Sequence, residues 1–183
     1  IGQREETATA QALALLLGMA AQQHAPAECD EPGVCFYILD GLPADSSNAG
    51  KLAAFGEQLP HRVVSGTHRD TEAIINELGT LLGRRRDDGE EKGARVVLFL
   101  HGLHRLRKLR RDEDDFSFSS GDDDSPAKPD QILGELLKDG PTHGIHVVAW
   151  IDTLNNLNRT LDRNGQREFE MRVLFQMSAN DSS

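Results

Sequence analysis

The first nine residues contain a glycine and a threonine at the spacing of the first glycine and the hydroxyl residue of a phosphate-binding loop. Such a loop has the pattern G-x-x-x-x-G-K-[ST], in which glycines let backbone N–H groups converge on phosphates, lysine neutralises the terminal phosphate and the hydroxyl binds magnesium. The residues at the four motif positions are, in order, Gly2, Thr7, Ala8 and Thr9. Glu5 and Glu6 would place carboxylates where phosphates bind. The position suits a phosphate loop, whereas these residues favour an ordinary turn between a strand and a helix.

A second pair of residues follows the apolar segment RVVLFL at 95–100. In a nucleotide hydrolase such a strand ends with an Asp that holds magnesium and a Glu that activates the attacking water. His101 and Gly102 stand there instead, and neither can do these jobs. We expect a strand that ends at Ile1 to lie beside 95–100, which would bring the degenerate loop next to His101. The loss of the lysine together with both carboxylates predicts that this site does not hydrolyse nucleotide.

The elements that must position these residues alternate between apolar strands and helices. Expected strands are 34–39, 62–64, 95–100, 145–151 and 173–177, and expected helices are 7–23, 46–58, 71–86 and 132–137. Thr7 and Asp70 are the expected N-caps of the first and third helices. The continuous apolar run 34–39 predicts a strand buried on both faces, and 95–100 and 145–151 are expected to be buried strands as well. Asp40 and Asp152 follow two of these strands. The pattern predicts a three-layer α/β fold, with a parallel sheet between two layers of helices.

Length and composition indicate one domain, 1–183, that contains an acidic insertion. The chain has 183 residues and a formal net charge of −10, which argues against a basic nucleic-acid module. Residues 112–127 contain seven acidic residues, four serines and no basic residue, so we expect this insertion to be mobile. The longest apolar stretch is too short to span a bilayer, and no signal peptide opens the chain. A cytoplasmic fragment of a longer protein is the expectation.

Three further groups of residues have both a functional and a structural interpretation. The histidine pairs His101/His104 and His143/His146 lack the other ligands of a known metal spacing, which favours structural roles. The two cysteines, Cys29 and Cys35, are too far apart for a C-x-x-C redox motif. The basic segment 105–111 would touch DNA phosphates or, as we favour, form a solvated helix face neutralised by the acidic insertion.

The whole chain resembles the FtsK/SpoIIIE group of P-loop motor ATPases, which includes DNA translocases and their relatives in secretion systems. The most similar stretch is 139–183, which begins DGPTHGIHVVAWID, and FYILDGLPAD at 36–45 matches the second strand and Asp loop of that family. The resemblance implies a RecA-like P-loop NTPase core. It places His101 and Gly102 at the Walker B position and Asp152 at the position of a polar sensor. The substitutions identify the chain as a degenerate module of that group.

The resemblance also implies cofactors and partners. ATP and magnesium are the cofactors of the family, and the substitutions predict weak or absent binding here. Expected partners are other modules of the same chain or a ring-forming oligomer, with DNA reached through the full-length protein and no membrane contact from this fragment. One helical face would hold the three arginines Arg159, Arg163 and Arg167, because they are spaced four residues apart. From this face an arginine finger would reach the nucleotide of a neighbouring subunit. An ion pair with Glu168 or Glu170 is the alternative explanation for these arginines. An active ATP-hydrolysing DNA translocase domain is the alternative function.

Overall fold

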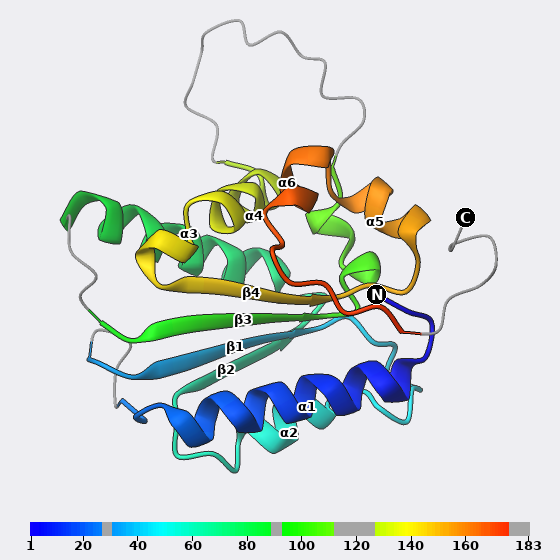
Figure 1. The fold of residues 1–183 in the computed structure, drawn as a ribbon, viewed down its shortest axis with the longest axis horizontal. Helices are drawn as coiled ribbons and strands as arrows, with labels where there is room; N and C mark the ends of the chain where they lie inside the picture. The colour runs from blue at the N-terminus through cyan, green and yellow to red at the C-terminus, as the bar shows by residue number, and fades with distance from the viewer. Residues whose placement is uncertain (27–30, 89–92, 112–126, 176–183) are drawn as a thin grey trace, which may run out of the picture.

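A four-stranded parallel sheet forms the centre of the protein (Figure 1). The computed structural model describes residues 1–26, 31–88, 93–111 and 127–175. The strand order is β2-β1-β3-β4, and the strands are β1 (Val34–Asp40), β2 (Val63–Thr67), β3 (Arg95–His101) and β4 (Ile145–Trp150). All three pairings are parallel, so the carboxyl ends of the strands meet at one edge. In the register, Asp40 pairs with His101, and His101 pairs with Trp150.

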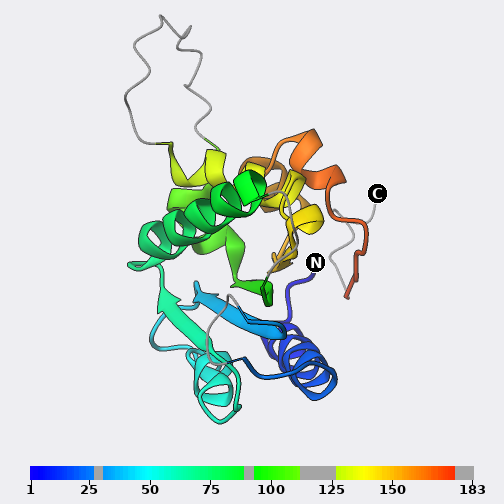
Figure 2. The same cartoon turned by 90° about the vertical axis from the view of Figure 1, so that its left-hand side faces the viewer.

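Helices cover both faces of the sheet, as the uninterrupted apolar runs predict. Figure 2 shows the sheet between the pair α1 and α2 on one side and α3 on the other. The main helices are α1 (Glu5–Gln22), α2 (Lys51–Gly56), α3 (Thr71–Asp88), α4 (Pro129–Lys138), α5 (Leu154–Thr160) and α6 (Arg163–Arg167). Three short 3-10 turns complete the described elements: η1 (Leu103–Arg105), η2 (Arg107–Leu109) and η3 (Pro141–His143).

Alternating strand side chains divide the core into two parts. On one face, Phe36, Ile38 and Phe99 pack against α1 and α2, whose buried residues include Leu16 and Leu52. On the other face, β1 and β3 pack against α3 and α4 through a larger apolar cluster, which includes Tyr37, Leu98, Leu78 and Leu136. Both faces of β1 and β3 are therefore buried, and the three-layer α/β class predicted from the sequence is confirmed.

Several predicted details differ in the structure. Helix α1 begins before Thr7, with Arg4 at the N-cap position, so the prediction that Thr7 caps it is wrong. The basic segment 105–111 lies in η1 and η2 and the residues after them, because Leu106 and Leu109 turn into the core in place of a regular helix face. Of the predicted strand 173–177, the described residues 173–175 are not part of the four-stranded sheet. The predicted acidic insertion, 112–127, lies outside the described residues except at its last position.

Two further observations bear on the sequence expectations. Cys35, which is buried on β1, is disulfide-bonded, whereas the spacing of the two cysteines gave no reason to expect a pair; Cys29 lies outside the described residues. Among the helices that the structure describes, none is long and apolar enough to cross a lipid bilayer.

Candidate functional site

The carboxyl edge of the sheet brings together polar side chains from β1, β3 and the first turn of α1. Parallel α/β sheets bind their ligands at this edge, so it is the place to look for a functional site. Asp40 ends β1 and His101 ends β3, and both are buried. The backbone N–H of Gly41 donates to the carbonyl of His101 at 2.8 Å and fixes the two strand ends to each other. A cluster of buried polar groups is therefore built into the fold here.

Both carboxylate oxygens of Asp40 have polar partners within the protein itself. Its Oδ1 accepts from the N–H of Leu42 at 2.9 Å and lies 3.4 Å from Nδ1 of His101, while Oδ2 accepts from the N–H of Gly50 at 2.7 Å. Burial by itself raises the pKa of Asp40, but these hydrogen bonds and the nearby imidazole outweigh it, so the pKa lies below its usual value. The carboxylate stays ionised at neutral pH, and both of its oxygens already engage groups of the protein.

His101 connects Asp40 to the first helix. Its Nε2 lies 3.2 Å from Oγ1 of Thr9, and the Thr9 hydroxyl in turn donates to the carbonyl of Glu5 at 2.8 Å. Thr9 is 2% exposed and His101 is 2% exposed. The residues at the hydroxyl position of the loop and at the Walker B position therefore do lie side by side, and their contact is closed to solvent.

A carboxylate from the chain itself occupies the start of α1. Oε1 of Glu5 accepts hydrogen bonds from the hydroxyl of Ser46 and from Nδ2 of Asn48, the second at 3.1 Å. Burial raises the pKa of Glu5, but the hydrogen bonds from Ser46 and Asn48 and the positive charge of Arg105 together hold it below the usual value. Glu5 and Glu6 thus place two negative charges at the positive end of the helix dipole, where a phosphate would otherwise be favoured.

The segment from Gly2 to the helix is too short to cradle phosphates. The N–H of Ala8 donates to the carbonyl of Arg4 at 3.1 Å, which is a helical hydrogen bond, and α1 begins at Glu5. Only Gln3 and Arg4 separate Gly2 from the helix, whereas the phosphate-loop pattern needs four residues between its glycines before the helix starts. The residues before Ala8 therefore form an ordinary helix start and not a glycine-rich loop that wraps around an anion.

The strand neighbour predicted for Ile1 is wrong. The N–H of Gly2 donates to the carbonyl of Ile151 at 3.0 Å, so this segment follows the end of β4, while β3 pairs only with β1 and β4 in the described sheet. The side chain of Trp150 covers it, because the indole N–H donates to the carbonyl of Gly2 at 2.9 Å. Ala8 packs against Trp150 in a small buried cluster and is 3% exposed. The lysine position of the motif therefore points into packed side chains.

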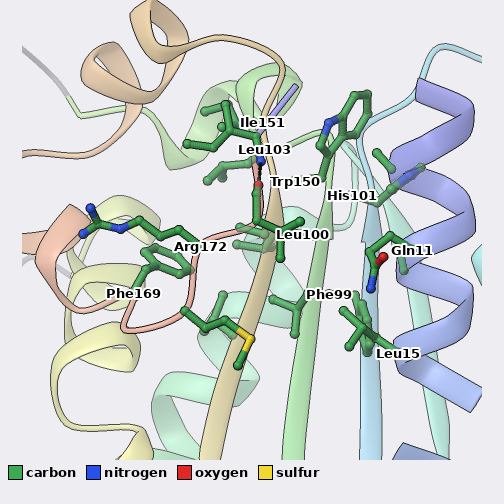
Figure 3. A pocket seen from close by; sticks show the side chains of 18 of the residues that line it. Gln11, Leu15, Phe99, Leu100, His101, Leu103, Trp150, Ile151, Phe169 and Arg172 are labelled. Carbon is green, nitrogen blue, oxygen red and sulfur yellow. Dashed lines mark hydrogen bonds between the residues drawn. The ribbon is translucent and has the colours of Figure 1, made fainter. Parts of the chain in front are cut away.

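Sequence reasoning did not predict that His101 and His104 both pack against Trp150. The ring centroid of Trp150 lies 5.2 Å from that of His101, and Figure 3 shows both side chains. It lies 5.5 Å from that of His104, and this second pair is edge-to-face. His104 Nε2 lies 3.6 Å from Oδ2 of Asp152, the residue at the sensor position. Burial lowers the pKa of His104, and Asp152 opposes this only in part. Asp152 also accepts from Nδ2 of Asn156 at 2.7 Å, so it holds α5 and η1 together.

The arrangement Asp40–His101–Thr9 has the same order of groups as a carboxylate–imidazole–hydroxyl relay. In such a relay the hydroxyl attacks a substrate that reaches it from solvent. Here the hydroxyl donates to the carbonyl of Glu5 and is buried, so no substrate carbonyl can approach it. Within the described ranges no group of three or more His, Cys, Asp or Glu residues is placed to hold a metal ion. The cluster binds the strand ends to α1 and leaves no reactive group exposed.

The three arginines predicted to share a helical face do not share one. Arg159 lies in α5, while Arg163 and Arg167 lie in the separate helix α6. Asp162 breaks the helix, because its side chain accepts from the N–H of Gly165 at 2.7 Å and caps the start of α6. All three arginines are exposed. An arginine finger that reaches the nucleotide of a neighbouring molecule would therefore have to be a single one of these arginines.

Comparisons with known proteins add one distant likeness. No protein-family model matches the chain, and no curated protein matches it. Among solved structures, it is similar to the cytoplasmic domain of the Thermomonospora curvata type VII secretion ATPase EccC, at 20% sequence identity and a TM-score of 0.49. The similarity covers 75% of this chain and 15% of that one, so this chain spans only a small part of that protein's length.

Proposed function

We propose that this chain is a non-hydrolysing module of the FtsK/SpoIIIE motor type, which works as a scaffold or regulator within a larger ATP-dependent translocase of DNA or protein. The motor-type part rests on the sequence resemblance of 36–45 and 139–183. The non-hydrolysing part rests on the carboxyl edge of the sheet.

The observation that carries the second part is the position of Glu5. In a working phosphate loop the start of the first helix is left open for an anion. In this chain Glu5 is the first residue of the helix, and its carboxylate is held beside the helix start by Ser46 and Asn48. A phosphate group would have to displace these bonds and enter a field that already holds two acidic side chains. This supports a module that does not depend on nucleotide.

The catalytic groups around that position support the same conclusion. Ala8 has no charge to offer, and a lysine there would have to displace the packing against Trp150. His101 engages Thr9 and Asp40, so neither the hydroxyl nor the carboxylate is left to coordinate magnesium. Removing one electrostatic stabiliser commonly lowers a catalytic rate by about 10²–10³-fold. Several such groups are missing here, and because they act as one unit their effects do not multiply.

The module would contribute its fold and its surface to the assembly. Its partners would be other modules of the same polypeptide or the subunits of a ring, in the cytoplasm. The net charge of −10 disfavours direct contact with DNA phosphates, so DNA would be handled by other parts of the full-length protein.

Steady-state phosphate release with saturating Mg-ATP tests the proposal. We expect the wild-type chain to release phosphate no faster than a buffer blank. The variant Ala8→Lys should not gain turnover, because His101 and Gly102 still lack the carboxylate functions. The proposal would be contradicted if the wild-type chain turned over ATP at about one per second and Thr9→Ala abolished this activity. That result would support the alternative of an active motor domain.

A further inference from the structure

The segment 105–111, which we call the basic ridge, carries its cations on a backbone that is anchored in the core. It lies in the two 3-10 turns after β3, where Leu103, Leu106 and Leu109 are each at most 1% exposed. A 3-10 helix has three residues per turn, so leucines that are three positions apart form one inward stripe. The basic residues lie between these leucines and are all exposed: Arg105, Arg107, Lys108, Arg110 and Arg111.

Three of the five cations contact other groups of the protein. Lys108 forms an ion pair with Glu72, with Nζ 2.6 Å from Oε2. Nε of Arg105 donates to Nε2 of His104 at 3.1 Å, and Arg110 donates to the backbone carbonyl of His104. Neither acceptor on His104 is a carboxylate. The contacts with His104 therefore hold these two guanidinium groups in place and leave their charge on the surface.

Arg107 and Arg111 are available to bind a partner. Their side chains form no hydrogen bond or ion pair with any residue that the structure describes, and both residues are exposed. A guanidinium group binds a carboxylate through two parallel hydrogen bonds, so arginine is well suited to acidic side chains. The ridge contains one quarter of all lysine and arginine residues of a chain whose net charge is −10. This local concentration of positive charge fits an anionic partner.

The length of the ridge limits the size of that partner. Seven residues at a 3-10 rise of about 2.0 Å extend over about 14 Å, which is the length of about four residues of an extended peptide. DNA fits less well, because its affinity for a protein depends on the number of phosphates that are neutralised. The net charge of −10 would also repel the parts of a duplex that extend beyond the ridge. A short acidic peptide can contact the ridge alone.

We propose that the basic ridge docks a short, extended acidic segment of a partner polypeptide, whose carboxylates pair with Arg107 and Arg111. These two residues are four positions apart, or about 8 Å along the ridge at the 3-10 rise. Side chains on the same side of an extended peptide recur every second residue, at about 7 Å. Acidic residues at alternate positions of the partner therefore match the two arginines. The proposal does not depend on whether the chain hydrolyses nucleotide.

Fluorescence anisotropy with a labelled octapeptide, in which glutamate alternates with serine, tests this proposal on the 183-residue protein. At neutral pH and about 50 mM salt we expect saturable binding, which is lost at about 500 mM salt because exposed charges are then screened. The double variant Arg107→Glu/Arg111→Glu should bind at least about tenfold more weakly.

The matched control is the double variant Arg84→Glu/Arg95→Glu. It makes the same change in net charge at two exposed positions near the amino ends of the strands, whereas the ridge follows the carboxyl end of β3. We expect its affinity to stay within about twofold of wild type, because surface charges beyond a Debye length are largely screened. Since all four arginines are exposed, both variants should keep the melting temperature of the wild type within a few degrees.

Three results would overturn the proposal. The first is equal weakening in the two double variants, which would show that only the net charge of the chain matters. The second is tighter binding of a labelled DNA duplex of about 20 base pairs than of the peptide, which would assign the ridge to nucleic acid. The third is no saturable binding of the peptide by the wild type up to about 1 mM. If binding then appeared once the seven acidic residues of 112–124 were replaced by Asn and Gln, the ridge would be assigned to the chain's own acidic residues.

Discussion

Replacing Asp40 with asparagine tests whether the polar cluster at the carboxyl edge stabilises the fold. The two oxygens of Asp40 accept from the N–H groups of Leu42 and Gly50, and Oδ1 also lies 3.4 Å from Nδ1 of His101. Asparagine keeps one of these oxygens, so its amide nitrogen must face at least one N–H donor in either orientation. A hydrogen bond to a charged group contributes about 1.5–3 kcal/mol, and a buried donor that loses its partner adds to this loss. We expect Asp40→Asn to lower the free energy of unfolding by about 2–3 kcal/mol.

Urea denaturation at several pH values measures this loss. Because the folded-state pKa of Asp40 lies below its unfolded value, the stabilisation is complete above the unfolded pKa of about 3.9. It is lost as the pH falls through the folded-state pKa. The difference between wild type and variant should therefore be constant from about pH 6 to 7 and shrink below about pH 4. The exposed Asp45→Asn is the matched control, with an expected change within about 0.5 kcal/mol. A loss below about 0.5 kcal/mol for Asp40→Asn would refute the reasoning.

Two other residues give direct tests. The phenol of Tyr37, the chain's single tyrosine, donates to Oε1 of Glu77 at 2.7 Å, and burial together with Glu77 raises its pKa to about 12. An absorbance titration should therefore show a midpoint near this value in the folded protein, and stability should fall as the pH rises from about 10 towards it; a midpoint near 10 would contradict the hydrogen bond. A Cβ at Gly140 would lie 2.1 Å from the carbonyl oxygen of Leu136, whereas one at Gly18 would meet no atom within 4 Å. Thermal denaturation should show a loss of more than about 2 kcal/mol for Gly140→Ala and a gain of about 0.5–1 kcal/mol for Gly18→Ala, which is a helical position; equal effects would contradict the packing.

The fold could be predicted because its strongest signals are local. The apolar runs at β1 and β3 are each long enough for one strand and contain no polar alternation, so burial on both faces follows from sequence alone. The run at β4 predicts the strand but not its exposure, because His146 is exposed and the next three residues are only half-buried. The order of neighbouring strands is not local. Nothing in the residues around Ile1 indicates that Gly2 pairs beside β4, and the prediction of β3 as its neighbour failed for this reason.

The candidate site was predictable in its residue types but not in its contacts. The missing lysine at Ala8 and the missing carboxylates at His101 and Gly102 could be read from the sequence. The bonds from Ser46 and Asn48 to Glu5 could not, because 41 and 43 positions separate these partners and a loop of ordinary composition brings them together. The break between α5 and α6 had a usable signal, since Asp is a preferred helix N-cap residue and Asp162 stands at that position.

The central claim is that the chain's own groups fill the position of a nucleotide phosphate. An NMR titration of the 183-residue protein with Mg-ATP, followed at the backbone amides of 3–9 and at the side chain of His101, tests it most directly. The account predicts no saturable shift at these positions up to about 1 mM nucleotide, which corresponds to a binding free energy weaker than about −4 kcal/mol. Saturable shifts of these amides at micromolar Mg-ATP, lost in Thr9→Ala, would contradict it.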